Sequence, residues 1–272
     1  MVIATIGCAM LYAIFLWWFS TGAILWLDRR PSRTYGLSMI GGSLVALAAI
    51  YGLVHSMTQT SPAAAVVGFT SALGLWGWHE LSFLTGFIAG PRKTACPPGA
   101  SGWRRFTLAA STLIYHEVAL VLTAGVLWEI LRAQPNKVGL WTFAILLVSR
   151  LSAKLNLYLG VPNFTAEFFP DHLRHLTSYL RKSPTNALFP AWVAAGVALA
   201  WAEAVSALRA DSTPFQVVGY SLVFALTALA LIEHAFMVLP IHDAALWRWA
   251  LPTSTKTSAA CLIQRGVNDH GL

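Results

Sequence analysis

The chain has 272 residues, of which 57% are hydrophobic and only 11% are charged. A soluble domain carries about a quarter charged residues, so this little charge cannot cover a water-exposed surface of that size. The surplus apolar surface must face lipid, and the composition indicates an all-α, polytopic membrane protein. The net charge is +7. In a membrane protein such a balance reflects loop orientation and contact with lipid headgroups, and we expect no nucleic-acid partner.

Apolar runs long enough to cross a bilayer recur along the chain, separated by breaks rich in Pro, Gly or charge. These runs cover approximately residues 3–27, 35–55, 63–90, 106–131, 138–161, 187–208 and 215–239. They predict a polytopic transmembrane helical bundle of about seven helices, forming a single domain over residues 1–251. The polar tail, residues 252–272, is expected to be disordered on the cytoplasmic side.

Lysine and arginine are distributed unequally between alternate loops, with thirteen residues on one side and three on the other. The richer side holds Arg29, Arg30, Arg33, Arg92, Lys93, Arg104, Arg105, Arg174, Arg181, Lys182, Arg248, Lys256 and Arg265, and the poorer side Arg132, Lys137 and Arg209. Because cytoplasmic loops carry the excess of positive charge, we predict a periplasmic N-terminus and a cytoplasmic C-terminus in a bacterial inner or intracytoplasmic membrane.

The loop over residues 164–182 has an amphipathic pattern that predicts a short interfacial helix on the cytoplasmic face. Its apolar positions are Phe168, Leu173, Leu176 and Leu180, and its polar positions are His172, Arg174, His175, Arg181 and Lys182. The two histidines are three residues apart and could share a helix face as ligands. Solvated histidines beside arginines are the interpretation that the pattern favours.

Ionisable side chains inside the predicted spans are the main functional signal, because burying charge in lipid is costly and such residues usually mark a site. Counted from the cytoplasmic ends of four spans, nine polar residues fall within one layer, at depths that agree to roughly 6 Å. The candidate residues are His79, Glu80, His116, Glu117, Arg150, Lys154, Asn156, Glu233 and His234. The sequence assigns no catalytic residue among them.

Three interpretations of this layer remain open. It could be a buried ion-pair network in which three glutamates balance Arg150 and Lys154, which lie four apart on one helix face. It could bind a tetrapyrrole, with a histidine as axial ligand and aromatic walls. It could also hold a transition metal, with His79, His116, Glu117, Glu233 and His234 as the candidate ligands.

The chain resembles the PuhE family of photosynthetic complex assembly proteins of phototrophic proteobacteria. The resemblance covers approximately residues 10–251 and rests on several long and unusual strings. Among them are FLWWFSTGAILWLDRRP, WGWHELSFLTGFIAGPRK, CPPGASGWRRF, YHEVAL, QPNKVGLWTF, RLSAKLNLYLGVPN, HLRHLTSYLRK and DAALWRWAL. The tail beyond residue 251 lies outside the matching pattern.

The resemblance implies an integral membrane assembly factor for the reaction centre and the core light-harvesting complex, influencing the supply or insertion of bacteriochlorophyll. Its implied partners are membrane lipid, reaction-centre or core antenna subunits, and pigment, with bacteriochlorophyll or a precursor as the implied cofactor. The family offers no catalytic residue to transfer. A non-catalytic assembly factor is therefore our first functional hypothesis. A membrane metalloenzyme with a di-metal or haem-like His/Glu site, acting on a bacteriochlorophyll or carotenoid precursor, is the alternative.

Overall fold

A computed structural model of the chain describes residues 2–164, 169–239 and 243–250, and within these ranges the fold is all-helical. The α-helices are α1 (Val2–Asp28), α2 (Tyr35–Ser56), α3 (Pro62–Leu84), α4 (Gly102–Ala110), α5 (Ile114–Leu131), α6 (Val138–Leu159), α7 (Leu188–Leu208) and α8 (Pro214–Val238). Three short 3₁₀ helices are η1 (Ser32–Thr34), η3 (Asp171–Tyr179) and η4 (Asp243–Trp247). The predicted fold class is confirmed.

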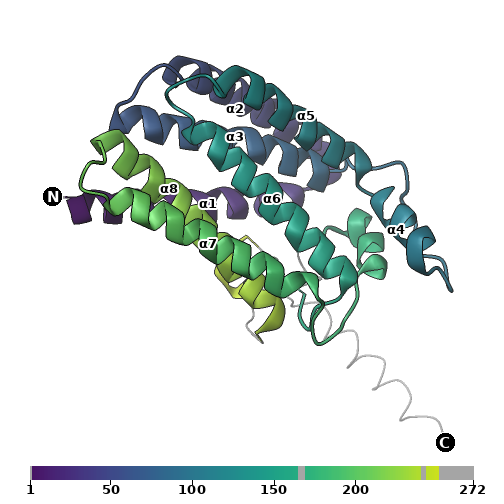
Figure 1. The fold of residues 1–272 in the computed structure, drawn as a ribbon. Coiled ribbons are helices and arrows are strands. Elements are labelled where there is room, and N and C mark those ends of the chain that lie inside the picture. Colours follow the sequence, from purple (N-terminus) through teal and green to yellow (C-terminus); the bar gives the residue numbers. More distant parts are fainter. Residues whose placement is uncertain (1, 165–168, 240–242, 251–272) are drawn as a thin grey trace, which may run out of the picture.

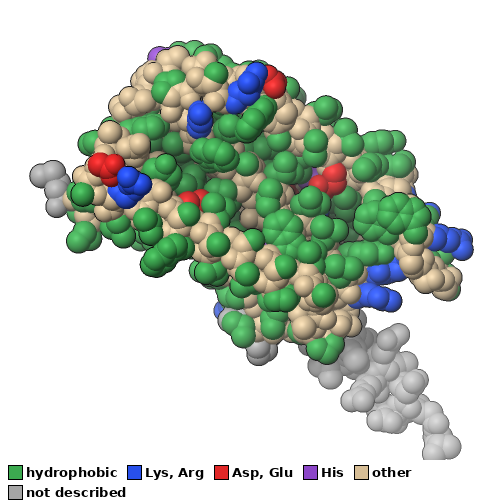
Figure 2. Space-filling view, viewed as in Figure 1, with side chains coloured by type: hydrophobic (Ala, Val, Ile, Leu, Met, Phe, Trp, Pro, Cys, Tyr) green, Lys and Arg blue, Asp and Glu red, His purple; other side chains and the backbone are tan. Residues whose placement is uncertain are grey.

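The long helices run roughly antiparallel to one another, so their connections gather at two ends of an elongated bundle (Figure 1). We call the end that carries α4, η3 and the α1–α2 connection the α4 end. The other end carries the N-terminus and the connections α2–α3, α5–α6 and α7–α8. Figure 2 shows hydrophobic side chains over most of the bundle, with Lys and Arg near its ends.

Six of the seven long helices are apolar enough to cross a membrane, and α3 is the exception. The reason is that α3 lies inside the bundle, packed against α1, α2, α6 and α8. Fifteen of its 23 residues are buried, including Ser71, His79 and Glu80. A helix whose sides are covered by protein does not need a lipid-compatible surface, so it tolerates polar residues that lower its hydropathy.

The predicted fourth span, residues 106–131, is not one helix, because the chain breaks at residues 111–113 between α4 and α5. The loop after α3 supplies hydrogen bonds for the interrupted backbone: Arg92 N donates to Ser111 O at 3.2 Å, and His116 N donates to Ala89 O at 3.1 Å. Gly90 permits this approach, since a Cβ there would lie 2.3 Å from Ser111 O. The predicted third span likewise ends at Leu84 rather than near residue 90.

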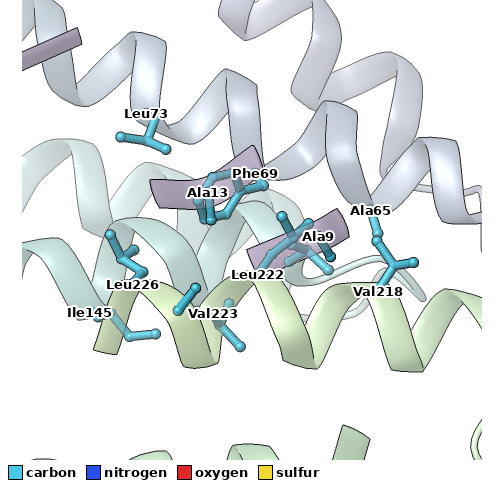
Figure 3. Packing of buried hydrophobic residues seen from close by; sticks show 12 residues of the cluster. Ala9, Ala13, Ala65, Phe69, Leu73, Ile145, Val218, Leu222, Val223 and Leu226 are labelled. Carbon is cyan, nitrogen blue, oxygen red and sulfur yellow. The ribbon is translucent and has the colours of Figure 1, made fainter. Parts of the chain in front are cut away.

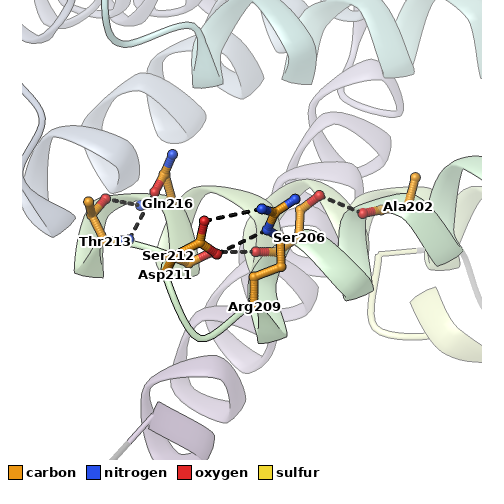
Figure 4. Close-up of polar contacts among 7 residues, drawn as sticks. All are labelled: Ala202, Ser206, Arg209, Asp211, Ser212, Thr213 and Gln216. Atoms are coloured by element: carbon orange, nitrogen blue, oxygen red, sulfur yellow. Dashed lines mark hydrogen bonds and ion pairs between the residues drawn. The ribbon is translucent and has the colours of Figure 1, made fainter.

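At the start of α3 and of α8, the N-cap side chain accepts a hydrogen bond from a backbone N–H of the first turn. Ser61 Oγ accepts from Ala64 N ahead of α3. At the start of α8, Thr213 and Gln216 form a reciprocal capping box. In the same connection Arg209 pairs with Asp211, and this hydrogen-bonded arginine lowers the pKa of the Asp211 carboxyl (Figure 4).

The main core lies where α1, α3, α6 and α8 meet, around Phe69 and Leu222, both fully buried (Figure 3). Small residues let α3 and α6 approach closely. A Cβ at Gly139 would lie 3.0 Å from Gly68 O and 2.4 Å from Leu53 Cδ2. Close backbone packing at small residues is a main source of helix association in membranes, where lipid tails are as apolar as the helix surface.

The segment predicted as an interfacial helix forms η3 and packs onto the α4 end of the bundle. Leu173 and Leu176 are buried against Phe83, Leu84 and Ala89. Leu180 is half-buried, and Phe168 lies outside the described residues. The apolar face of this segment therefore contacts protein and closes the α4 end.

We expect Gly139→Ala to destabilise the protein by about 1–3 kcal/mol, because the added methyl group overpacks the α3–α6 contact. The matched control is Gly125→Ala in α5, where an added Cβ meets nothing within 4 Å. The measurement is the thermal unfolding midpoint of each purified variant in detergent. Equal midpoints for the two variants would contradict the predicted close packing.

Candidate functional site

Two carboxylate–cation pairs connect α6 with its neighbours near the α4 end. Arg150 Nη2 donates to Glu80 Oε2 of α3 at 3.3 Å. One helical turn further along, Lys154 Nζ donates to Glu117 Oε1 of α5 at 2.5 Å. The four-residue spacing puts both cations on one face of α6. From that face Arg150 contacts α3 and Lys154 contacts α5.

Direct pairing reduces the free-energy cost of placing these charged side chains at membrane depth. A lone ion taken out of water costs several kcal/mol, and an opposite charge in direct contact compensates much of that cost. Glu80 and Glu117 are each paired with an arginine or lysine side chain and not with a histidine. The pairing thus agrees with the network interpretation, although it does not assign the residues a role in function.

Glu233 of α8 adds a third carboxylate to the same region. It lies in the wall of the cavity that also contains both ion pairs. The charges that act on the Arg150 guanidinium include those of Glu80, Glu233 and Glu117. This group holds three acids and two cations.

His234 and Asn156 belong to a separate hydrogen-bond chain that joins α8, α6 and the start of α7. His234 Nδ1 lies 2.8 Å from Ala230 O, which can only accept, so Nδ1 carries the N–H and donates. The other ring nitrogen, Nε2, then accepts a hydrogen bond from Ser152 Oγ, also at 2.8 Å. Asn156 Nδ2 donates to Ser152 O at 3.0 Å. Asn186 Nδ2 then donates to Asn156 Oδ1 at 3.0 Å. This hydrogen-bond chain links α6 to α8 and to the residue before α7.

The remaining two predicted histidines lie between α3 and α5. His79 Nε2 is 3.0 Å from Thr123 Oγ1. His116 is fully buried with its ring 4.7 Å from that of Phe83, and neither of its ring nitrogens has a hydrogen-bond partner among the described residues. The structure therefore divides the nine predicted residues into an acid–cation group, a His234–Asn156 chain and two histidines at the α3–α5 contact.

The proposed metal ligands are not brought together as a set. Within the described ranges, no group of three or more His, Cys, Asp or Glu side chains is placed to hold a metal ion. Glu117 contacts Lys154, His234 contacts Ser152, and His116 packs on Phe83. This donor arrangement does not fit a di-metal centre.

A cavity of about 740 Å³ lies beside the acid–cation group at the α4 end, within the usual size range of small-molecule sites. Glu80, Glu117, Arg150, Lys154 and Glu233 all line it. The rest of its wall is mainly apolar and aromatic, and the aromatic members include Trp17, Trp76, Phe83, Phe106, Tyr158, Phe236 and Trp247. The cavity is the strongest candidate for a ligand site in the described part of the chain.

The two histidines of η3 lie outside the spanning helices. The side chain of His172 is mostly exposed. The part that packs against the bundle loses hydration, which lowers the pKa of the imidazole, whereas a backbone hydrogen bond with Leu84 and the charge of Asp171 act to raise that pKa. Its ring lies 6.1 Å from that of Tyr35. His175 Nδ1 is 3.2 Å from His172 O, a local contact within η3. His172 thus packs against the start of α2 and the end of α3, while the printed contact of His175 lies within η3.

Sequence reasoning missed two buried acids. Glu203 of α7 is 6% exposed, and its Oε1 accepts from Thr227 Oγ1 of α8 at 3.2 Å. Asp28 at the end of α1 is 1% exposed, with Arg29 Nε 3.8 Å from its Oδ1. Both lie close to the ends of predicted spans, where charge is common. The available signal for Glu203 was its position inside the apolar run 187–208, whereas Asp28 directly follows the run 3–27 and precedes two arginines.

The chain matches, over residues 3–258, the family described as "Protein of unknown function (DUF3623)". The match continues past residue 251, where we expected the resemblance to end. It is also 42% identical over 256 residues to a Rhodobacter capsulatus protein described as "Uncharacterized 30.4 kDa protein in puhA 5'region", covering 89% of this chain and 90% of that one. No solved structure matches the chain. The chain belongs to the DUF3623 family.

Proposed function

We propose that this protein is an integral membrane assembly factor for the photosynthetic reaction centre and the core light-harvesting complex, influencing bacteriochlorophyll supply or insertion. The observation that carries the proposal is the description of the Rhodobacter capsulatus relative, which places that protein in the puhA 5' region. This agrees with the resemblance to the PuhE family, whose members are encoded with the reaction-centre H subunit. Its proposed partners are membrane lipid, complex subunits and pigment.

The geometry supports a binding role more than metal chemistry. Glu80 and Glu117 are each engaged by a cation, while the adjacent cavity offers an aromatic wall to a membrane-soluble molecule. Aromatic faces stack on flat ring systems. A pigment or pigment precursor is therefore a suitable occupant, and the nine polar residues act as the lining and support of its site.

We further propose that the α4 end faces the cytoplasm and that the protein resides in a bacterial inner or intracytoplasmic membrane. The support is the loop charge asymmetry: the α1–α2, α3–α5 and α6–α7 connections hold ten of the lysines and arginines counted above and meet at this end. Among the described residues, the lysines and arginines at the opposite end are Arg132, Lys137 and Arg209.

Reporter fusions test this orientation. Fusions after Arg104 and after Arg248 are expected to read as cytoplasmic, and a fusion after Thr60 as periplasmic, because positively charged loops stay inside. Alkaline phosphatase and a fluorescent protein that folds only in the cytoplasm give opposite readouts for the two sides. A periplasmic signal after Arg248 would contradict the predicted combination of a periplasmic N-terminus and an odd number of spans.

Deletion of the gene in a phototrophic bacterium that carries it tests the proposed function. We expect membranes of the deletion strain to show lower absorption from the reaction centre and core antenna, restored by the wild-type gene and by the Gly125→Ala variant. Total pigment extracted into organic solvent separates the two arms: a fall indicates supply, and unchanged pigment with fewer complexes indicates insertion. Unchanged complex levels in the deletion strain would refute the proposal.

A further inference from the structure

The break between α4 and α5 puts α4 at the level of the lipid headgroups. Helix α5 has 18 residues. At 1.5 Å per residue they measure about 27 Å, which nearly matches a hydrocarbon core of roughly 30 Å, so α5 crosses the membrane by itself. The nine residues of α4 measure about 14 Å, too short for a span. Figure 1 shows α4 at the end of the bundle, where the membrane meets water.

Opposite sides of α4 have different surroundings. Arg105 is buried: its Nη2 donates to Tyr179 O of η3, and its guanidinium lies 4.3 Å from the centre of the Tyr158 ring of α6. The two preceding residues point away from these contacts, and Trp103 is 75% exposed and Arg104 is also exposed. Arg105 thus holds α4 to the bundle while an aromatic and a cationic side chain remain outside. This combination is typical of amphipathic helices that lie in a membrane interface.

Other large aromatic side chains are exposed at the same end. Phe87, three residues after α3, is 60% exposed, and Trp26, near the end of α1, is 44% exposed. The guanidinium of Arg30 lies 3.7 Å from the centre of the Trp26 ring. Aromatic side chains gather at membrane–water interfaces, where an apolar ring and a nearby polar group are both accommodated. The α4 end therefore carries aromatic anchors beside its cations.

The exposed cations of the α4 end are less neutralised by acids than those of the opposite end. Two salt bridges engage cations at the opposite end, Arg132–Glu129 at 3.2 Å and Arg209–Asp211 at 3.0 Å. Among the described residues of the α1–α2, α3–α5 and α6–α7 connections, the exposed acid is Asp171, which pairs with Arg174. The exposed cations beyond that pair are Arg30, Arg33, Lys93, Arg104, Arg181 and Lys182. Figure 2 shows the contrast on one face, with red beside blue away from the α4 end and blue without adjacent red near it.

We propose that the α4 end binds the headgroups of anionic phospholipids. Helix α4 lies in the headgroup layer, Lys93 and Arg104 contact lipid phosphates, and Trp103 inserts among the upper parts of the acyl chains. Charge complementarity supports this partner, because each Lys or Arg near an anionic bilayer adds to the attraction. Lipid is favoured over an acidic protein, since the surface lies at headgroup depth and exposes aromatic rings beside its cations. The inference goes beyond the proposed function, because headgroup selectivity holds whichever complex the protein assembles.

Competition between two lipids for the purified full-length protein tests the proposal. The protein is equilibrated in mixed micelles with equal amounts of anionic phosphatidylglycerol and zwitterionic phosphatidylcholine, and native mass spectrometry measures the ratio of the two bound lipids. We expect the wild type to retain phosphatidylglycerol at least about tenfold in excess. Inorganic phosphate at the same concentration should not displace it, because free phosphate lacks acyl chains. Displacement by inorganic phosphate would overturn a lipid as the occupant.

Two double variants that remove the same charge separate the α4 end from the opposite end. Lys93→Gln/Arg104→Gln should lower the lipid ratio at least about fivefold, whereas Arg132→Gln/Lys137→Gln should leave it unchanged. Trp103→Ser should lower the retention of both lipids without changing their ratio, because insertion of the ring does not depend on the headgroup. A wild-type ratio near one, equal ratios in the two double variants, or unchanged retention in Trp103→Ser would overturn the proposal. Binding of polyglutamate without any lipid preference would also overturn it, in favour of an acidic protein partner.

Discussion

The pairing of charges at membrane depth is the constraint on which the α4 end of the bundle depends. Arg150 and Lys154 lie on one face of α6, and each requires an acid within reach because lipid offers no solvation. Glu80 of α3 and Glu117 of α5 meet that requirement. The pairs therefore fix the position of α6 relative to α3 and α5 at this end. Near the other end, close packing of Gly68 and Gly139 fixes the position of α6 relative to α3.

The arrangement around these pairs has a functional consequence. Long side chains that meet across helices leave space between the backbones, and at the α4 end this space is the aromatic-walled cavity of about 740 Å³. The His234–Ser152–Asn156 chain holds the α6–α8 side of that space in a fixed geometry. Leu176 of η3 contributes to its wall and packs in the same hydrophobic cluster as Phe83 and Leu84. A stable network and a ligand site are therefore compatible uses of the same residues.

The sequence predicted the helical class and the positions of the long helices, because apolar length is a local property. It did not predict the break at residues 111–113, since that break depends on Gly90 bringing a distant loop against Ser111. Depth counting placed Glu80, Glu117, Arg150 and Lys154 in one layer. It could not assign partners, because helix rotation and neighbours are tertiary properties, and it did not predict that His234 and Asn156 both hydrogen-bond to Ser152. Glu203 was missed because a carboxylate near a span end is ordinarily solvated.

Exchange of the charges of Glu117 and Lys154 tests the central claim, that paired charge between α5 and α6 holds the α4 end together. The measurement is the amount of monodisperse protein extracted from membranes for Glu117→Lys, Lys154→Glu and the double exchange. Each single variant leaves two like charges facing each other and is expected to accumulate poorly, while the double exchange restores an attractive pair and should recover much of the wild-type level. A double exchange no better than either single variant would contradict the account.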